Sequence, residues 1–168
     1  MFFNEDEITK VPLDAEDIIE RNWRFYDGEG HKYEIVNDPN RVEWEIRQNE
    51  KTRRKIECIL DNFPFQETVE NQCGYWVRSI SGVHPFPNAN HRTSTETLLY
   101  ILNENGYKIA KVTKPLIGDS VNRSKKLKKP PNAIQVTTDN LRERDKLFRL
   151  WRDHFEYELW RYYVRNNL

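Results

Sequence analysis

The sequence predicts a mainly α fold, a helical bundle of about six helices with at most short β-hairpin elements. Three observations favour it. Apolar residues recur at steps of three and four over several long segments. Residues that start or stop helices stand at segment ends, such as Asp14 before the first and Gly106 after a later one. Strand patterns are few and short, and they are confined to residues 33–36, 107–109 and 133–137.

Each expected helix has its own signal. Asp14 can cap a helix that extends to about residue 26, and Asn40 with Glu43 has the spacing of a capping box at the start of the next. Pro64 stops a third helix, because the residue before proline avoids the helical conformation. The expected helices cover about residues 14–26, 40–46, 50–62, 66–81, 90–104 and 140–164.

Two of these helices carry strong apolar faces. In the helix over 66–81, Cys73 shares a face with Trp76 and Ile80, which predicts a core thiol rather than a reactive one. The segment 140–164 is predicted to be a long amphipathic helix, and its aromatic stripe is interpreted as core packing rather than a ligand cage.

Length and composition exclude several classes of protein. The 168 residues suit one domain spanning 1–168, and 12% aromatic residues argue against disorder. No apolar run approaches the length of a membrane span, and the acidic N-terminus does not resemble a signal peptide. Two cysteines, Cys58 and Cys73, are typical of a reducing compartment, so we expect a cytoplasmic protein without a membrane partner.

The formal net charge of zero conceals a division along the chain. Residues 1–110 carry 13 basic and 20 acidic side chains, whereas residues 111–168 carry 14 basic and 7 acidic ones. The densest basic segment, residues 123–129, stands between Gly118 and a Pro-Pro pair and is predicted to be an exposed loop. Such a segment is either simply solvated or contacts an RNA-associated partner.

Residues 83–93 do not have the pattern of core packing. His84 precedes two closely spaced prolines, which end one helix, and Arg92 lies in the first turn of the next. A helix N-terminus offers free amides to an anion, and an arginine adds a bidentate phosphate donor. His84 could act there as a general base, which indicates phosphoryl or nucleotidyl transfer. The alternative is a proline-rich turn with a surface histidine.

The segment His84-Pro-Phe-Pro-Asn-Ala-Asn-His-Arg92 resembles the Fic/Doc motif H-P-F-x-[D/E]-[G/A]-N-[G/K]-R. Six of the eight specified positions match: His84, Pro85, Phe86, Ala89, Asn90 and Arg92. The resemblance covers about residues 14–110 and is closer to the Doc (death-on-curing) branch. Residues 111–168, the basic loop and the C-terminal helix, have no counterpart that we can place.

The resemblance implies a Fic fold that binds ATP and Mg²⁺. The implied catalytic residues are His84, as the base for a Ser, Thr or Tyr hydroxyl of a target protein, and Arg92. The implied metal position is Asn88. A separate antitoxin protein is implied as a partner. The implied nucleotide-binding residues are Phe86, Asn88, Ala89, Asn90, His91, Arg92 and Thr93.

Two departures from the motif matter. Asn88 replaces the family's carboxylate, which weakens the expected Mg²⁺ site because an amide neutralises no charge. His91 stands where adenylylating members have glycine and Doc toxins have lysine, and a bulky, titratable side chain favours the Doc arrangement. We therefore expect a Doc-like phosphotransferase acting on a Ser/Thr hydroxyl, of a translation factor for instance, as the toxin of a toxin–antitoxin pair. The alternatives are a weak or inactive Fic-fold nucleotide- or partner-binding protein and a Fic-type protein adenylyltransferase.

The other histidines carry less weight. His31 follows a glycine-rich turn and is expected to be solvated, and His154 is expected to be exposed or capped by Glu158. No spacing of His and Cys residues indicates a zinc site.

Overall fold

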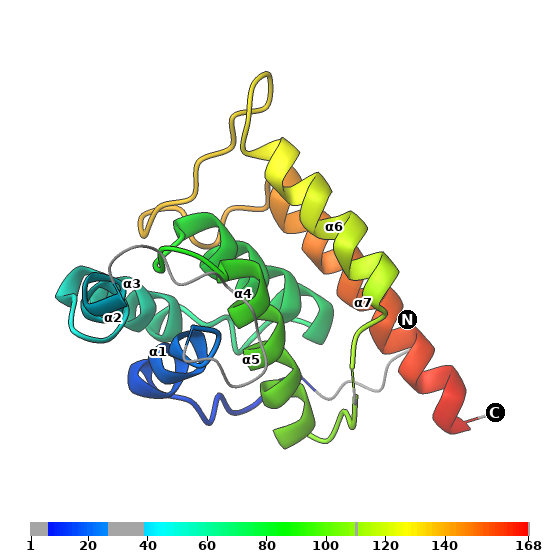
Figure 1. The fold of residues 1–168 in the computed structure, drawn as a ribbon. Coiled ribbons are helices and arrows are strands. Elements are labelled where there is room, and N and C mark those ends of the chain that lie inside the picture. Colours follow the sequence, from blue (N-terminus) through cyan, green and yellow to red (C-terminus); the bar gives the residue numbers. More distant parts are fainter. Residues whose placement is uncertain (1–6, 27–38, 110, 168) are drawn as a thin grey trace.

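The computed structural model describes residues 7–26, 39–109 and 111–167, and these residues form seven helices and no strand (Figure 1). The prediction of a mainly α fold is confirmed. The helices are α1 (Ala15–Trp23), α2 (Pro39–Arg47), α3 (Glu50–Asp61), α4 (Val69–Val83), α5 (Asn90–Glu104), α6 (Lys114–Leu127) and α7 (Lys146–Asn167).

Capping side chains mark the starts of α1 and α3. The Asp14 side chain accepts a hydrogen bond from the Asp17 amide, and the Asp17 carboxylate accepts one from the Asp14 amide, so the start of α1 is a capping box. α5 covers the residues predicted for it. Of the predicted strands, residues 107–109 and 133–137 have no regular structure, while residues 33–36 lie outside the described part of the chain.

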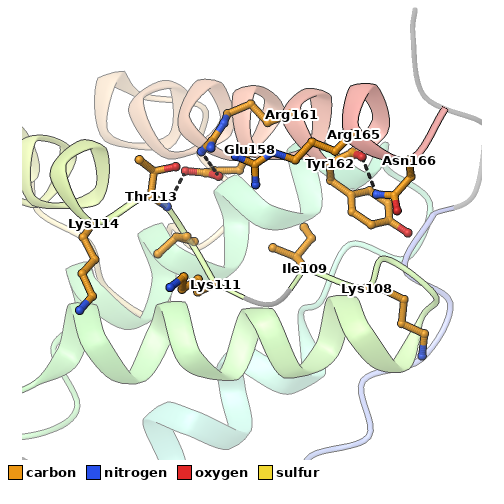
Figure 2. A pocket seen from close by; sticks show the side chains of 11 residues that line it. Lys108, Ile109, Lys111, Thr113, Lys114, Glu158, Arg161, Tyr162, Arg165 and Asn166 are labelled. Carbon is orange, nitrogen blue, oxygen red and sulfur yellow. Dashed lines mark hydrogen bonds and ion pairs between the residues drawn. The ribbon is translucent and has the colours of Figure 1, made fainter. Parts of the chain in front are cut away.

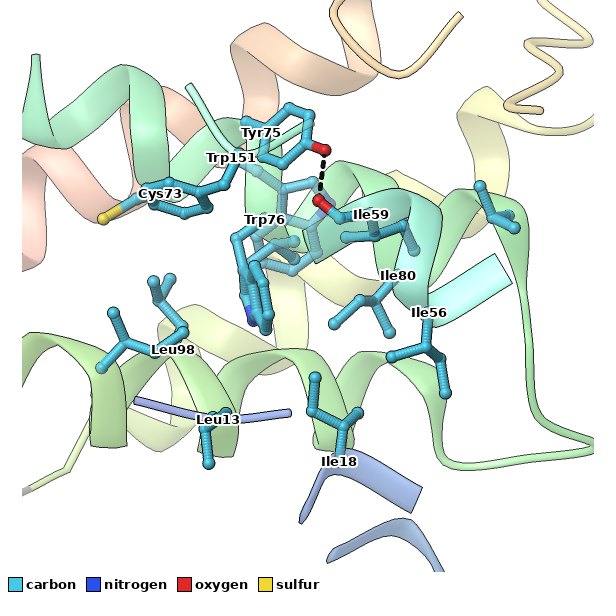
Figure 3. Close-up of a cluster of buried hydrophobic side chains, with 14 of the residues drawn as sticks. Leu13, Ile18, Ile56, Ile59, Cys73, Tyr75, Trp76, Ile80, Leu98 and Trp151 are labelled. Atoms are coloured by element: carbon cyan, nitrogen blue, oxygen red, sulfur yellow. Dashed lines mark hydrogen bonds between the residues drawn. The ribbon is translucent and has the colours of Figure 1, made fainter. Parts of the chain in front are cut away.

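Helix α4 forms the centre of the molecule, and 12 of its 15 residues are buried. It packs against α3, α5 and α7. Figure 3 shows Trp76 of α4 and Trp151 of α7 in the core, and both are fully buried. Cys73 is also fully buried, and burial raises the pKa of its thiol, so the prediction of a core cysteine is confirmed. The aromatic stripe of α7 is core, as predicted: Trp151 and Phe155 have no exposed surface.

A buried charge fastens α7 to α4. The Arg78 side chain is fully buried and donates two hydrogen bonds from Nε and one from Nη2 to the Asp145 carboxylate, at 3.1, 3.1 and 2.7 Å. Its Nη1 donates to the carbonyl oxygens of Asn140 and Leu141 at 2.9 and 3.0 Å. Asp145 also accepts from the Phe148 amide. Residues 140–145 therefore wrap around Arg78 in turns, and α7 begins at Lys146 rather than near residue 140.

The prediction of an exposed basic loop at 123–129 is wrong. Residues up to Leu127 belong to α6, and Lys128 caps it. Gly118, taken as a sign of a loop, lies inside α6 with open space where a side chain would be. The Pro-Pro pair stands beyond the helix end and only terminates it. α6 lies along α7 (Figure 1) and buries Ser120 and Ser124 toward it.

His154 is also placed differently from the prediction. It is 5% exposed, and its Nδ1 hydrogen-bonds the Ser120 hydroxyl at 2.8 Å, joining α6 to α7. Its neighbours Asp153 and Glu156 are exposed, whereas His154 is buried, as is Glu158 one turn further along the helix. His31 lies outside the described residues.

Among residues 7–26, 39–109 and 111–167, no helix is both long enough and apolar enough to cross a membrane.

Candidate functional site

The motif segment forms the connection between α4 and α5. His84 ends α4 with φ 55° and Ala89 precedes α5 with φ 61°, both in the left-handed region. A residue with a side chain is strained there by roughly 1–2 kcal/mol, so the surrounding structure must hold both ends of the loop. Ala89 has the smallest side chain that a residue other than glycine can have, which limits this strain.

The Asn90 side chain closes the loop on itself. Its Oδ1 accepts a hydrogen bond from the Phe86 amide at 3.1 Å, and its Nδ2 donates to the Phe86 carbonyl at 2.9 Å. Asn90 is 3% exposed and Phe86 is 1% exposed. The Phe86 ring therefore plugs into the core, and Asn90 keeps the backbone of residues 86–90 in one conformation.

Helices α1 and α3 hold the loop from outside. Asn22 of α1 donates from Nδ2 to the Asn88 carbonyl at 3.1 Å and to the Thr93 hydroxyl at 2.9 Å. Thr52 of α3 directs its hydroxyl to the Pro85 carbonyl at 3.0 Å. Each anchor is buried. The backbone of the loop is thus bound by side chains that lie far away in the sequence.

The outer side of the loop faces a cavity of about 610 Å³, which we call the motif cavity. This volume falls within the usual range for small-molecule sites. His84, Asn88 and Arg92 line it from the loop and α5, and Glu96 contributes a carboxylate. Four lysines complete it: Lys111, Lys114, Lys125 and Lys128. The cavity is therefore strongly cationic.

The end of α6 is fixed beside the loop. Lys128 donates from Nζ to the Ser81 carbonyl at 2.8 Å, near the end of α4. His91 Nε2 hydrogen-bonds the Ser124 hydroxyl at 2.9 Å, and that hydroxyl oxygen accepts from Trp151 Nε1 at 3.3 Å. A motif residue is thereby connected to both α6 and α7.

The crowding of cations changes the titration of the histidines. Burial, followed by the charges of Lys128 and Lys125, lowers the pKa of His91 from its usual 6.5 to about 3. Desolvation, with Lys128 and Lys55, also lowers the pKa of His84, although its side chain is exposed. Both imidazoles are neutral at pH 7. The positive charge beside the titratable His91 side chain therefore comes from lysines of the cavity wall and not from the imidazole itself.

The structure brings most of the predicted site residues together. His84, Asn88, Ala89, Asn90, His91 and Arg92 all line the motif cavity. Phe86 and Thr93 do not, because Phe86 fills the core and the Thr93 hydroxyl is fully buried against Asn22. Both side chains shape the loop in this structure, and their assignment to nucleotide binding stays a prediction.

The anchors and the lysines were not identified from the sequence. Asn22 and Thr52 sit in ordinary helical patterns, and only the fold shows that they reach the loop. Lys125 and Lys128 did give a signal as part of the basic segment 123–129. Because the sequence predicts an exposed loop there, it gives no reason to place these lysines beside the motif.

A polyphosphate fits this cavity better than a magnesium ion does. Cationic side chains and the free amides at the start of α5 are suitable partners for phosphate oxygens. Mg²⁺ prefers carboxylates, but Glu96 is the one carboxylate among the described residues of the cavity wall, and Asn88 Oδ1 accepts from the Ala89 amide at 2.8 Å. Among the described residues, no group of three His, Cys, Asp or Glu could hold a metal. The described donors do not fit the family's magnesium site.

No known protein family, curated protein or solved structure matches this chain.

Proposed function

We propose that the chain is a Doc-like phosphotransferase, which moves the terminal phosphate of ATP to a Ser or Thr hydroxyl of a target protein. One observation carries the proposal: a neutral histidine, His84, stands on the wall of a cavity that holds four lysines and Arg92. The motif resemblance supplies the reaction class, and the cavity supplies the matching chemistry. A cytoplasmic toxin restrained by an antitoxin is the biological setting that the resemblance implies.

In this mechanism His84 is the base. Its neutral imidazole accepts the proton of the attacking hydroxyl while the oxygen forms a bond to the γ-phosphorus. The bond from phosphorus to the β–γ bridging oxygen breaks, and ADP leaves. Lys125, Lys128 and Arg92 stabilise the phosphate oxygens, because fixed positive groups facing the transferred phosphoryl group lower the barrier. No step requires a metal ligand from the protein.

The test separates the two phosphates of ATP. The protein is incubated in a cell extract with ATP labelled at either the α or the γ position. Label from the γ position alone on a target protein supports phosphotransfer, whereas label from the α position supports the adenylyltransferase alternative. Replacing His84 by Ala is expected to lower transfer by a factor of about 10²–10⁴, the usual contribution of a general base.

A neighbouring pair of lysines provides a matched control. Lys125 lines the motif cavity and Lys126 does not, although both are exposed residues of α6. Lys125→Gln should raise the Kd for ATP about tenfold through the loss of one charge-assisted contact, and Lys126→Gln should leave it unchanged. Equal effects of the two substitutions would contradict the assignment of the cavity.

One observation favours a second candidate, a nucleotide-binding protein with little or no activity. Asn88 replaces the motif's carboxylate, and its amide oxygen is already bonded to the Ala89 amide. If ATP binds but neither label transfers, and Asn88→Asp then restores transfer, this second function replaces the first.

A further inference from the structure

A second cavity of about 560 Å³ lies between residues 108–114 and the C-terminal half of α7 (Figure 2). Five of its lining residues are cations, and they come from both sides: Lys108, Lys111, Lys114, Arg161 and Arg165. Lys111 and Lys114 also line the motif cavity, so the two cavities share a wall.

The carboxylate in the second cavity leaves most of this charge unbalanced. Glu158 is 4% exposed, and its Oε1 accepts from the Thr113 amide at 3.0 Å. Its Oε2 accepts from Arg161 at 3.3 Å (Figure 2). Glu158 thus holds the segment 108–114 against α7 and neutralises Arg161. None of the remaining cations, Lys108, Lys111, Lys114 and Arg165, forms an ion pair with another described residue.

Two exposed aromatic rings of α7 lie beside Arg161, at the edge of the second cavity. Tyr157 is 48% exposed and Trp160 is 43% exposed, and their rings stack with centroids 6.0 Å apart and planes 30° apart. The Arg161 guanidinium carbon lies 5.9 Å from the centre of the Tyr157 ring, so Arg161 connects the cavity to the aromatic pair. Nearly half of each residue is therefore open to solvent in the described part of the chain. Their large exposed surface contributes little to folding and is available to a ligand.

We propose that the second cavity and the Tyr157–Trp160 pair bind a single-stranded nucleic acid. Unpaired cations in a groove neutralise a phosphodiester backbone, and exposed aromatic rings provide a platform on which unpaired bases stack. An acidic peptide would satisfy the lysines but would not use a flat pair of stacked rings. The proposal does not depend on the proposed function, because Lys108, Arg161, Arg165 and the two rings lie outside the motif cavity.

The first experiment measures the role of charge. A fluorescent single strand of about 12 nucleotides, made as RNA and as DNA, is titrated with the full chain and followed by anisotropy. If the four unpaired cations neutralise four phosphates, the logarithm of the binding constant should fall with the logarithm of the salt concentration with a slope of about −3. The double variant Lys108→Gln, Arg165→Gln loses two of these contacts, so the slope should become shallower by about 1.4. Lys51→Gln with Arg54→Gln removes the same charge from the exposed surface of α3 and should change nothing. Equal loss in both double variants would overturn the proposal.

The second experiment measures the role of stacking. Trp160→Ala should weaken binding of the single strand at least fivefold, the low end of the effect of removing a stacked aromatic. Trp44→Ala is the matched control, because Trp44 is 52% exposed and belongs to α2, which lies far from the C-terminal half of α7 in Figure 1. An unchanged affinity in Trp160→Ala would overturn the proposal. So would equal binding of inorganic polyphosphate, or binding of anionic lipid vesicles without binding of the strand.

One further variant keeps the two proposals apart. His84→Ala should abolish transfer of label from ATP and leave the affinity for the strand unchanged, since His84 does not line the second cavity. If the unmodified chain binds the single-stranded nucleic acid but transfers no label from ATP, the nucleic-acid proposal is supported and the phosphotransferase proposal is rejected. Transfer without strand binding would do the reverse.

Discussion

The buried Arg78–Asp145 pair yields the sharpest stability prediction. Arg78→Met keeps an unbranched apolar stem in the core but removes every donor of the guanidinium group. Asp145, whose side chain is 14% exposed, then loses its partner, and the carbonyls of Asn140 and Leu141 lose their donor. Removing one member of a buried ion pair destabilises a protein by about 3–5 kcal/mol.

Urea denaturation at constant pH measures this change as a difference in the free energy of unfolding. For a chain of this size each 1 kcal/mol shifts Tm by about 2–4 °C, so we expect Tm to fall by about 6–20 °C. Asp145→Asn should also destabilise strongly, because it leaves the guanidinium charge buried. The two effects should not add in the double variant, since each substitution breaks the same network.

Arg144→Met is the control for this prediction. Arg144 also pairs with a carboxylate, Glu67, at 2.7 Å, but its side chain is 55% exposed. An exposed pair contributes about 0–1 kcal/mol. If Arg78→Met and Arg144→Met lower the free energy of unfolding equally, burial does not determine the strength of these pairs and the reasoning is refuted.

The remaining predictions concern two glycines and acid stability. Gly118→Ala should stabilise the chain by up to about 1 kcal/mol, because alanine favours a helix and the added methyl group meets open space. Gly82→Ala should destabilise it by about 1–3 kcal/mol, because the new Cβ would overlap the Val136 side chain. Thermal melts of both variants check the opposite signs. Between pH 6.5 and about 3, unfolded His91 binds a proton that folded His91 does not, so acid should destabilise the fold by up to about 1.4 kcal/mol per pH unit. His91→Gln should show a flatter pH dependence in urea denaturation, and an equally steep one would contradict the lowered pKa.

The helices were predictable from the sequence where apolar periodicity and caps agreed. α5 starts and ends at the predicted residues, and α1 starts after its predicted cap, Asp14. α6 was missed because it has few large apolar residues: it buries Ser120 and Ser124, which have no hydrophobic pattern. The late start of α7 was not predictable either. Residues 140–145 are held out of the helix by hydrogen bonds to Arg78, which is distant in the sequence.

The site was predictable only where chemistry and position in the sequence coincide. His84 and Arg92 were singled out as a base and a phosphate ligand beside a helix break, and both line one cavity. Residue type alone did not show which way a side chain turns. Thr93 follows Arg92 directly, yet a step of 100° around α5 directs it to Asn22 instead of the cavity.

The basic half of the chain completes the site that the motif begins. Residues 111–168 lie beyond the resemblance, but they supply Lys125 and Lys128 to the motif cavity and the Ser124 hydroxyl to His91. Desolvation and the charge of Lys125 together lower the pKa of Lys128, so a phosphate bound between these lysines would reduce their repulsion. This unfavourable crowding of cations is stable only because α6 is fastened to α7, and α7 to α4. The division of charge along the sequence therefore has a structural counterpart, because the acidic half carries the motif and the basic half adds lysines to the wall of the same cavity.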